Sequence, residues 1–203
     1  MRALALALLT ACSAYAGTTD GTARPLKPGE AEAVFAAGCF WCVESAFDDL
    51  PGVIEAVSGY TGGATAKPTY YQVGAGKTGH TEAVRVVYDP KKVSYEQLLQ
   101  VFWHNVDPFD PDGQFCDQGD QYRPGVFPVD AAQAAAAAAS KAAADKRLGK
   151  PTVVQITQAG PFWMAEDYHQ DYHRTNTLKY RYYRWGCGRD ARLTEVWGAD
   201  AGH

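Results

Sequence analysis

The alternation of apolar and polar residues along the chain predicts a series of short strands and helices. Runs that fit strands lie at residues 33–37, 53–57, 82–88 and 152–157. Apolar residues recur at helical spacing between Trp41 and Leu50, and Ser94 with Gln97 forms a capping box for a second helix. Asp130 caps a third helix, which is rich in alanine, the best helix former.

This order of elements predicts an α+β protein, a two-layer sandwich with a small mixed sheet of the ferredoxin-like kind. Two loops rich in glycine or proline interrupt it, from Gly59 to Gly79 and from Asp107 to Val129, and such long loops often form the walls of a site. From Pro161 onward we expect a long coil-rich C-terminal tail with one short helix, whose many aromatic residues serve packing.

The first residues have the pattern of a secretory signal. Arg2 precedes an apolar run that is too short to span a bilayer, and small residues then fit cleavage after Ala16. We therefore expect a signal peptide, a flexible leader and one periplasmic or secreted domain, at residues 1–16, 17–30 and 31–203. In a second interpretation, Leu9 to Cys12 is a lipobox, and the mature protein is a lipoprotein anchored through Cys12.

The net charge of the chain indicates no particular binding partner. Removing residues 1–16 removes one of the 19 basic residues and none of the 23 acidic ones, so the formal net charge changes from −4 to −5. An acidic balance of this size gives no reason to expect affinity for nucleic acid or for a membrane surface. We expect a monomer.

Four cysteines remain after the predicted cleavage: Cys39, Cys42, Cys116 and Cys187. An even number in an exported chain is typical of two structural disulfides. The position of Cys39 instead predicts a nucleophile. A cysteine at the junction of a strand and a helix lies near free backbone N–H groups and the positive end of the helix dipole, and both stabilise a thiolate. The C-x-x-C spacing lets Cys42 reach Cys39, whereas a zinc site needs a second ligand pair at similar spacing.

At this point the sequence resembles a known family. Gly38-Cys39-Phe40-Trp41, followed by Glu44, is similar to the signature of the A-type methionine sulfoxide reductases. Further blocks resemble that family in the same order, at residues 57–63, 68–70, 78–84, 88–90 and 121–123, and the similarity covers roughly residues 32–174.

The resemblance implies a function and a set of site residues. Cys39 would attack the sulfur of methionine sulfoxide while Glu82, in a dry pocket that keeps it protonated, gives a proton to the departing oxygen. Tyr70 and Tyr122 would hydrogen-bond that oxygen. Phe40 and Trp41 resemble the apolar cradle for the substrate methyl group, and Asp117 the carboxylate that holds the substrate backbone. The resemblance also implies preference for the S epimer, on proteins and on free methionine, in the repair of oxidative damage. No cofactor or metal is implied, and His80, His169 and His173 are left without a role.

A cysteine sulfenic acid at Cys39 requires a second thiol to resolve it. Cys42 is the first choice, because a C-x-x-C pair needs little backbone movement to form a disulfide. Cys187, between two flexible glycines, is the runner-up, and Cys116 is the third candidate. A thioredoxin-like protein would then reduce the disulfide. Two other classes stay open: a thiol–disulfide oxidoreductase that uses Cys39 and Cys42, and an envelope-anchored binding module whose cysteines are structural.

Overall fold

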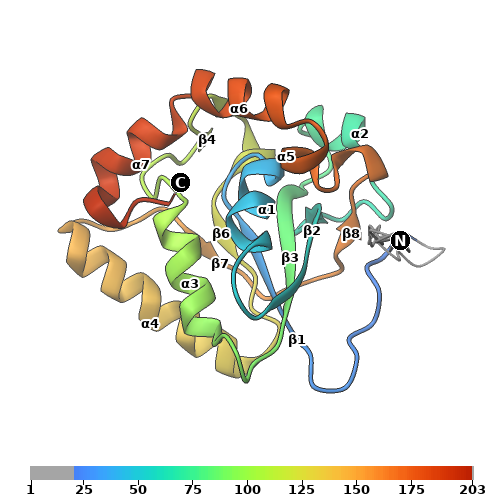
Figure 1. The fold of residues 1–203 in the computed structure, drawn as a ribbon, viewed down its shortest axis with the longest axis horizontal. Helices are drawn as coiled ribbons and strands as arrows, with labels where there is room; N and C mark the ends of the chain where they lie inside the picture. Colours follow the sequence, from blue (N-terminus) through green and yellow to red (C-terminus); the bar gives the residue numbers. More distant parts are fainter. Residues whose placement is uncertain (1–20, 203) are drawn as a thin grey trace, which may run out of the picture.

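A six-stranded sheet forms the centre of the computed structural model, which describes residues 21–202. The strand order is β7-β6-β1-β3-β2-β8 (Figure 1). The strands are β1 (Ala31–Ala36), β2 (Val53–Thr61), β3 (Thr81–Tyr88), β6 (Gly125–Val126), β7 (Gln155–Ile156) and β8 (Trp163–Met164). All pairs are antiparallel except β6 with β7, so the sheet is mixed, and the predicted combination of helices with a mixed sheet is confirmed.

Three helices begin where the sequence predicted them. They are α1 (Phe40–Asp48), α3 (Tyr95–His104) and α4 (Ala131–Leu148). The capping box at Ser94 and Gln97 is present, and the Asp130 carboxylate accepts a hydrogen bond from the N–H of Gln133 at 2.8 Å. Figure 1 shows α3 and α4 side by side, with α1 in front of the sheet.

The core lies between the sheet, α1 and α3. Phe35 of β1 stacks on Phe47 of α1 and on Phe102 of α3, with ring centroids 5.1 and 5.4 Å apart. Every residue of β3 is buried, including the polar ones. This strand is therefore covered on both faces, and the charged residues that it carries lie inside the protein.

The prediction of a coil-rich C-terminal tail is wrong. The segment folds into three helices, α5 (Tyr172–Thr175), α6 (Thr177–Gly186) and α7 (Arg189–Trp197), which run along one side of the molecule (Figure 1). The indole of Trp197 donates to the carbonyl of Val106 at 2.9 Å and packs near Trp103. The long loops also contain short elements, namely α2 (Tyr70–Gly74), β4 (Gly113–Gln114) and β5 (Asp117–Gln118).

The N-terminal predictions fall mostly outside the described residues. The expected signal peptide and Cys12 lie there, whereas residues 21–30 are described and begin beside β8, where the N–H of Met164 donates to the carbonyl of Gly21 at 3.0 Å. In that stretch, Arg24 forms ion pairs with Glu30 and Glu55, each at 2.7 Å. Among residues 21–202, we find no helix with the length and hydrophobicity needed to cross a bilayer.

Candidate active site

Cys39 lies at the N-cap position of α1 and is 6% exposed. It follows Gly38, whose φ of +81° falls in the left-handed region, and a Cβ at Gly38 would lie 2.5 Å from the Cβ of Gln114. Glycine is therefore required before the helix. The tight turn that it makes delivers the sulfur of Cys39 into the interior, at the start of the helix, as the sequence predicted.

A small cavity of about 70 Å³ opens beside Cys39. It is lined by Cys39, Phe40, Trp41, Tyr70, Glu82, Asp117, Tyr122 and Tyr183. The structure thus brings together the predicted nucleophile, the predicted acid and all five predicted substrate-binding residues. The segments that carry them are the start of α1, α2, β3, β5 and a 3-10 turn at Asp120–Tyr122, and α6 adds Tyr183.

Glu82 projects from β3 toward the first turn of α1. Its Oε2 accepts a hydrogen bond from the backbone N–H of Phe40 at 3.0 Å. Burial raises the pKa of Glu82 to about 8, and the negative charge of Asp117 acts in the same direction. The carboxyl group is therefore largely protonated at neutral pH and can donate a proton into the cavity.

Two phenol hydroxyls face the same space. Burial, with the nearby charge of Glu82, raises the pKa of Tyr70 to about 12, and the same causes raise the pKa of Tyr122 further. Both hydroxyls therefore remain hydrogen-bond donors at any physiological pH. The position of Tyr70 is set by Glu166, whose carboxylate accepts from the N–H of Tyr70 and from the hydroxyl of Tyr60, each at 2.9 Å.

The apolar side of the cavity is formed by Phe40 and Trp41. The Trp41 ring stacks on Tyr172 with centroids 3.8 Å apart and an interplanar angle of 9°. Its indole N–H donates to Nδ1 of His169 at 3.1 Å. His169, which the sequence analysis left without a role, therefore holds the orientation of Trp41 together with the packing of Tyr172.

Cys39 and Cys42 are both buried thiols, and they share a hydrogen bond. Burial raises the pKa of Cys39 well above its ordinary value, whereas the hydrogen bond from Cys39 and the charges of Arg189 and Arg184 lower the pKa of Cys42 to about 6. The surroundings therefore favour a thiolate at Cys42 over one at Cys39 in the reduced pair.

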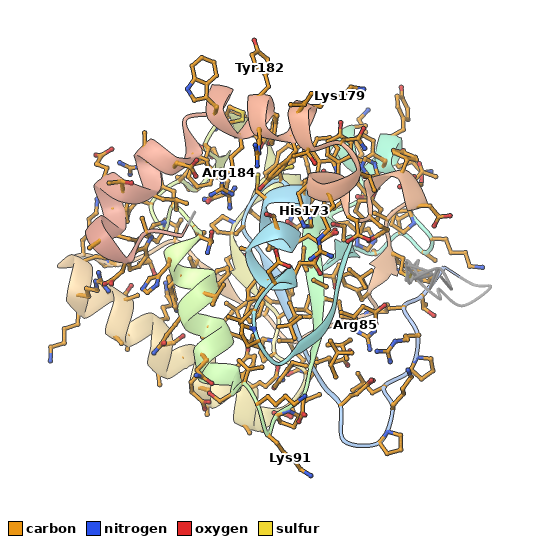
Figure 2. The ribbon with its side chains drawn as sticks, viewed as in Figure 1. Arg85, Lys91, His173, Lys179, Tyr182 and Arg184 are labelled. Atoms are coloured by element: carbon orange, nitrogen blue, oxygen red, sulfur yellow. A yellow bond between two sulfur atoms is a disulfide. The ribbon has the colours of Figure 1, made fainter. Side chains whose placement is uncertain are left out.

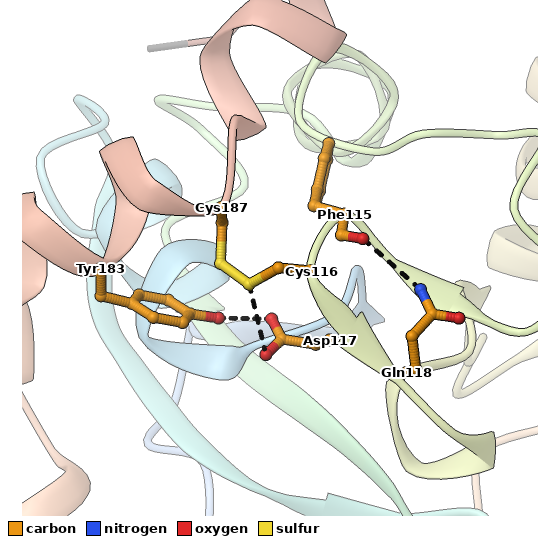
Figure 3. The surroundings of a disulfide bond; sticks show 6 residues. All are labelled: Phe115, Cys116, Asp117, Gln118, Tyr183 and Cys187. Carbon is orange, nitrogen blue, oxygen red and sulfur yellow. Dashed lines mark hydrogen bonds between the residues drawn. A yellow bond between two sulfur atoms is a disulfide. The ribbon is translucent and has the colours of Figure 1, made fainter.

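The other two cysteines form a disulfide, Cys116–Cys187, with a Cα–Cα distance of 4.9 Å (Figure 3). It joins the residue before Asp117 to the end of α6. The hydroxyl of Tyr183 donates a hydrogen bond to Asp117, and Oδ1 of Asp117 lies 3.9 Å from the sulfur of Cys116. The disulfide therefore borders the cavity wall that Asp117 and Tyr183 form.

Tyr183 is the cavity residue that sequence reasoning missed, because it belongs to the segment predicted as coil. Helical spacing offered one clue: Tyr183 precedes Cys187 by four residues, so a helix there places both side chains on one face. Figure 2 shows the opposite orientation for Tyr182, which projects outward from α6 and is 74% exposed.

One further group of side chains has the composition of a metal site. Glu44 and Asp48 of α1 converge with His173, whose Nε2 lies 3.3 Å from Oδ2 of Asp48. Glu44 accepts hydrogen bonds from the hydroxyl of Ser58 and, at 2.5 Å, from the N–H of Asp171. These contacts join α1 to β2 and α5. A larger hollow of about 460 Å³ lies between α3 and α4, away from the thiols.

Comparison with known proteins gives a consistent result. A family model described as peptide methionine sulfoxide reductase matches residues 31–201. The chain is 48% identical over 199 residues to peptide methionine sulfoxide reductase MsrA 2 of Caulobacter vibrioides, covering 98% of this chain and all of that protein. It is 44% identical over 201 residues to MsrA/MsrB of Vibrio cholerae, covering 98% of this chain but only 52% of that protein, so it spans about half the length of this relative.

The fold agrees with solved structures as well. Methionine sulfoxide reductase A of Corynebacterium diphtheriae superposes with a TM-score of 0.70 at 32% sequence identity, over 75% of this chain and 77% of that one.

Proposed function

Because this chain belongs to the peptide methionine sulfoxide reductase family, we propose that it reduces methionine S-sulfoxide, in proteins and as the free amino acid, in the cavity beside Cys39. The observation that carries the proposal is the meeting of a buried thiol, Cys39, and a protonated carboxyl group, Glu82, in one small cavity. A thiol and a proton donor are the two groups that the removal of oxygen from a sulfoxide needs.

In the first step, the hydroxyls of Tyr70 and Tyr122 donate hydrogen bonds to the sulfoxide oxygen. Glu82 gives its proton to that oxygen while the sulfur of Cys39, as a thiolate, attacks the sulfoxide sulfur. The products are methionine and a sulfenic acid at Cys39, so the oxygen atom moves to Cys39 and the substrate sulfur gains two electrons. Phe40 and Trp41 contact the methyl group of the substrate.

In the second step, Cys42 attacks the sulfenic sulfur. A disulfide forms between Cys39 and Cys42 and one water molecule leaves. The lowered pKa of Cys42 supports this assignment, because the attacking species is a thiolate. Cys187 and Cys116, the alternatives, are bonded to each other in the reduced active-site state. A thioredoxin-like dithiol would then reduce the Cys39–Cys42 disulfide by exchange and become oxidised itself.

We also propose a fold type, a compartment and an oligomeric state for this protein. The order β6-β1-β3-β2, with α1 and α3 in the connections, supports a ferredoxin-like sandwich at the centre of the fold. The Cys116–Cys187 disulfide supports export to an oxidising compartment, the periplasm or outside the cell. In that compartment the reductant would have to draw its electrons from across the membrane, and the protein would act as a monomer.

A stoichiometric reaction without reductant tests the proposal. The protein, with Cys39 and Cys42 as free thiols and the Cys116–Cys187 disulfide intact, is mixed with the S or the R epimer of an N-acetylated methionine sulfoxide, and methionine and free thiols are counted. We expect about one methionine per protein from the S epimer, with a disulfide that peptide mapping assigns to Cys39 and Cys42. A protein that reduces disulfides of other proteins but forms no methionine would instead be a thiol–disulfide oxidoreductase. A Cys39–Cys187 disulfide with free Cys42 would contradict the resolving role of Cys42.

A further inference from the structure

Tyr183 lines the cavity but takes no part in the two reaction steps described above. It reaches the cavity from α6, and its ring meets Trp41 edge-on with centroids 5.8 Å apart. Its hydroxyl donates to Asp117 (Figure 3), and Tyr183 lines the same small cavity as Cys39. A single phenol group thus contacts the predicted substrate carboxylate and shares a small cavity with the predicted nucleophile.

The surroundings of Cys39 make such a donor necessary. The titratable groups that face it are Cys42 from the same helix, Tyr70 from α2, Glu82 from β3, Asp117 from β5, Tyr122 from the 3-10 turn and Tyr183 from α6. Burial disfavours a thiolate at Cys39, and negative charges on Glu82 or Cys42 disfavour it further, whereas a hydrogen bond from Tyr183 favours it.

We propose that Tyr183 is a catalytic residue of the sulfoxide reduction, whose hydroxyl donates to the sulfur of Cys39 as this becomes the attacking thiolate, and that the Cys116–Cys187 disulfide holds it in place. The inference rests on the proposed function for the reaction that it serves. Burial raises the pKa of Tyr183 far above its usual range, so the phenol keeps its proton and acts as a donor only.

One hydroxyl proton cannot serve two acceptors equally well, so the hydrogen bond changes partner during the reaction. In the reduced protein Tyr183 donates to Asp117. When Cys39 ionises, the thiolate competes for the same proton, and a carboxylate oxygen of Asp117 becomes available to a backbone N–H of the substrate. Ionisation of the nucleophile and capture of the substrate are thereby coupled through one side chain.

The disulfide links the two segments that carry this contact. Asp117 directly follows Cys116, and Tyr183 lies one helical turn before Cys187. The outer face of α6 is exposed at Leu178, Tyr182 and Trp185. A covalent link at the end of this helix limits its movement away from the cavity, so we assign the disulfide a positioning role.

The variant Tyr183→Phe tests the proposal, with Tyr182→Phe as the matched control on the exposed face of α6. Alkylation of Cys39 by iodoacetamide is followed by peptide mass spectrometry from about pH 6 to about pH 10, which reports the ionisation of this one thiol. Below the raised pKa of Cys39 the alkylation rate is proportional to the thiolate fraction. We therefore expect this rate to fall by about tenfold or more in Tyr183→Phe, as the loss of a hydrogen bond to a charged group implies, and to stay unchanged in Tyr182→Phe. Single-turnover formation of methionine near neutral pH should slow by about tenfold or more.

An unchanged alkylation profile in Tyr183→Phe would overturn the inference, and this readout needs no sulfoxide. It can therefore fail or succeed independently of the proposed function, which fails only if the wild-type protein forms no methionine. The variant Asp117→Asn shows whether Tyr183 acts on Cys39 directly or through Asp117. The change in Cys39 alkylation caused by Tyr183→Phe should persist when Asp117→Asn is also present. If the change disappears there, Tyr183 acts only by holding Asp117.

The role of the disulfide has its own test, the double variant Cys116→Ala/Cys187→Ala. We expect a shift of Cys39 ionisation in the same direction as in Tyr183→Phe but smaller, with turnover on thioredoxin slowed rather than abolished. Normal single-turnover chemistry combined with complete loss of thioredoxin-supported turnover would overturn the positioning role, because it would make the two cysteines a relay for electrons.

Discussion

Glu82→Gln should slow the reaction and stabilise the fold, and the second effect should depend on pH. The glutamine has the shape of a protonated glutamic acid, and its carbonyl can still accept the hydrogen bond that the N–H of Phe40 donates at 3.0 Å. It cannot give a proton to the departing oxygen. Single-turnover methionine formation should therefore fall by about 10²–10⁴, which is the usual contribution of a positioned general acid.

The size of the stability effect follows from the pKa of Glu82. A rise from 4.5 to about 8 on folding corresponds to about 5 kcal/mol at high pH. Because the folded state binds the proton more tightly than the unfolded chain, the free energy of unfolding of the wild type falls as the pH rises from about 4.5 to about 8. Glu82→Gln does not titrate, so its advantage over the wild type should grow over this range and then level off.

Urea unfolding followed by circular dichroism at about pH 5, 7 and 9 measures this difference. Burial also raises the pKa of Glu44 to about 8. Because Glu44 is present in both proteins, its contribution to the pH dependence cancels in the difference between their free energies of unfolding. Glu96→Gln, at an exposed position on α3, is the control for replacing a glutamate by a glutamine and should change the free energy of unfolding little. A constant difference between Glu82→Gln and the wild type from pH 5 to pH 9 would refute the argument that burial keeps Glu82 protonated.

Three other substitutions test the thiols. Cys39→Ser should leave the circular dichroism spectrum unchanged and abolish methionine formation, because a hydroxyl is a far weaker nucleophile than a thiolate; activity above about a tenth of the wild type would exclude Cys39 as the nucleophile. Cys42→Ser should still form about one methionine per protein but should not turn over with thioredoxin, since only the step after the sulfenic acid is blocked; sustained turnover would assign that step to another cysteine. Removal of the Cys116–Cys187 disulfide, which spans 71 residues, should lower the free energy of unfolding by about 2–4 kcal/mol in denaturant titrations, and an unchanged midpoint would show that the two segments are held by other contacts.

The sequence by itself determined the features that depend on near neighbours. The start of α1 after Gly38, the capping box at Ser94 and the cap at Asp130 are all present as predicted. These features follow from the φ that a glycine permits and from hydrogen bonds between residues three positions apart, and both can be recognised in a short stretch of sequence. The ordered motifs around Cys39 and Glu82 likewise pointed to the family.

Only the tertiary structure decided what depends on distant segments. The sequence analysis expected one short helix where three are present. In α6 the large apolar residues Leu178, Tyr182 and Trp185 are exposed and Arg184 is buried, so the hydrophobic pattern does not mark the inward face. Glu82 is buried because segments from other parts of the chain cover both faces of β3, and the sequence of the strand alone does not show this. The contact of Tyr183 with Asp117, 66 residues apart, arises only when α6 packs against the cavity, because no local interaction joins segments so far apart.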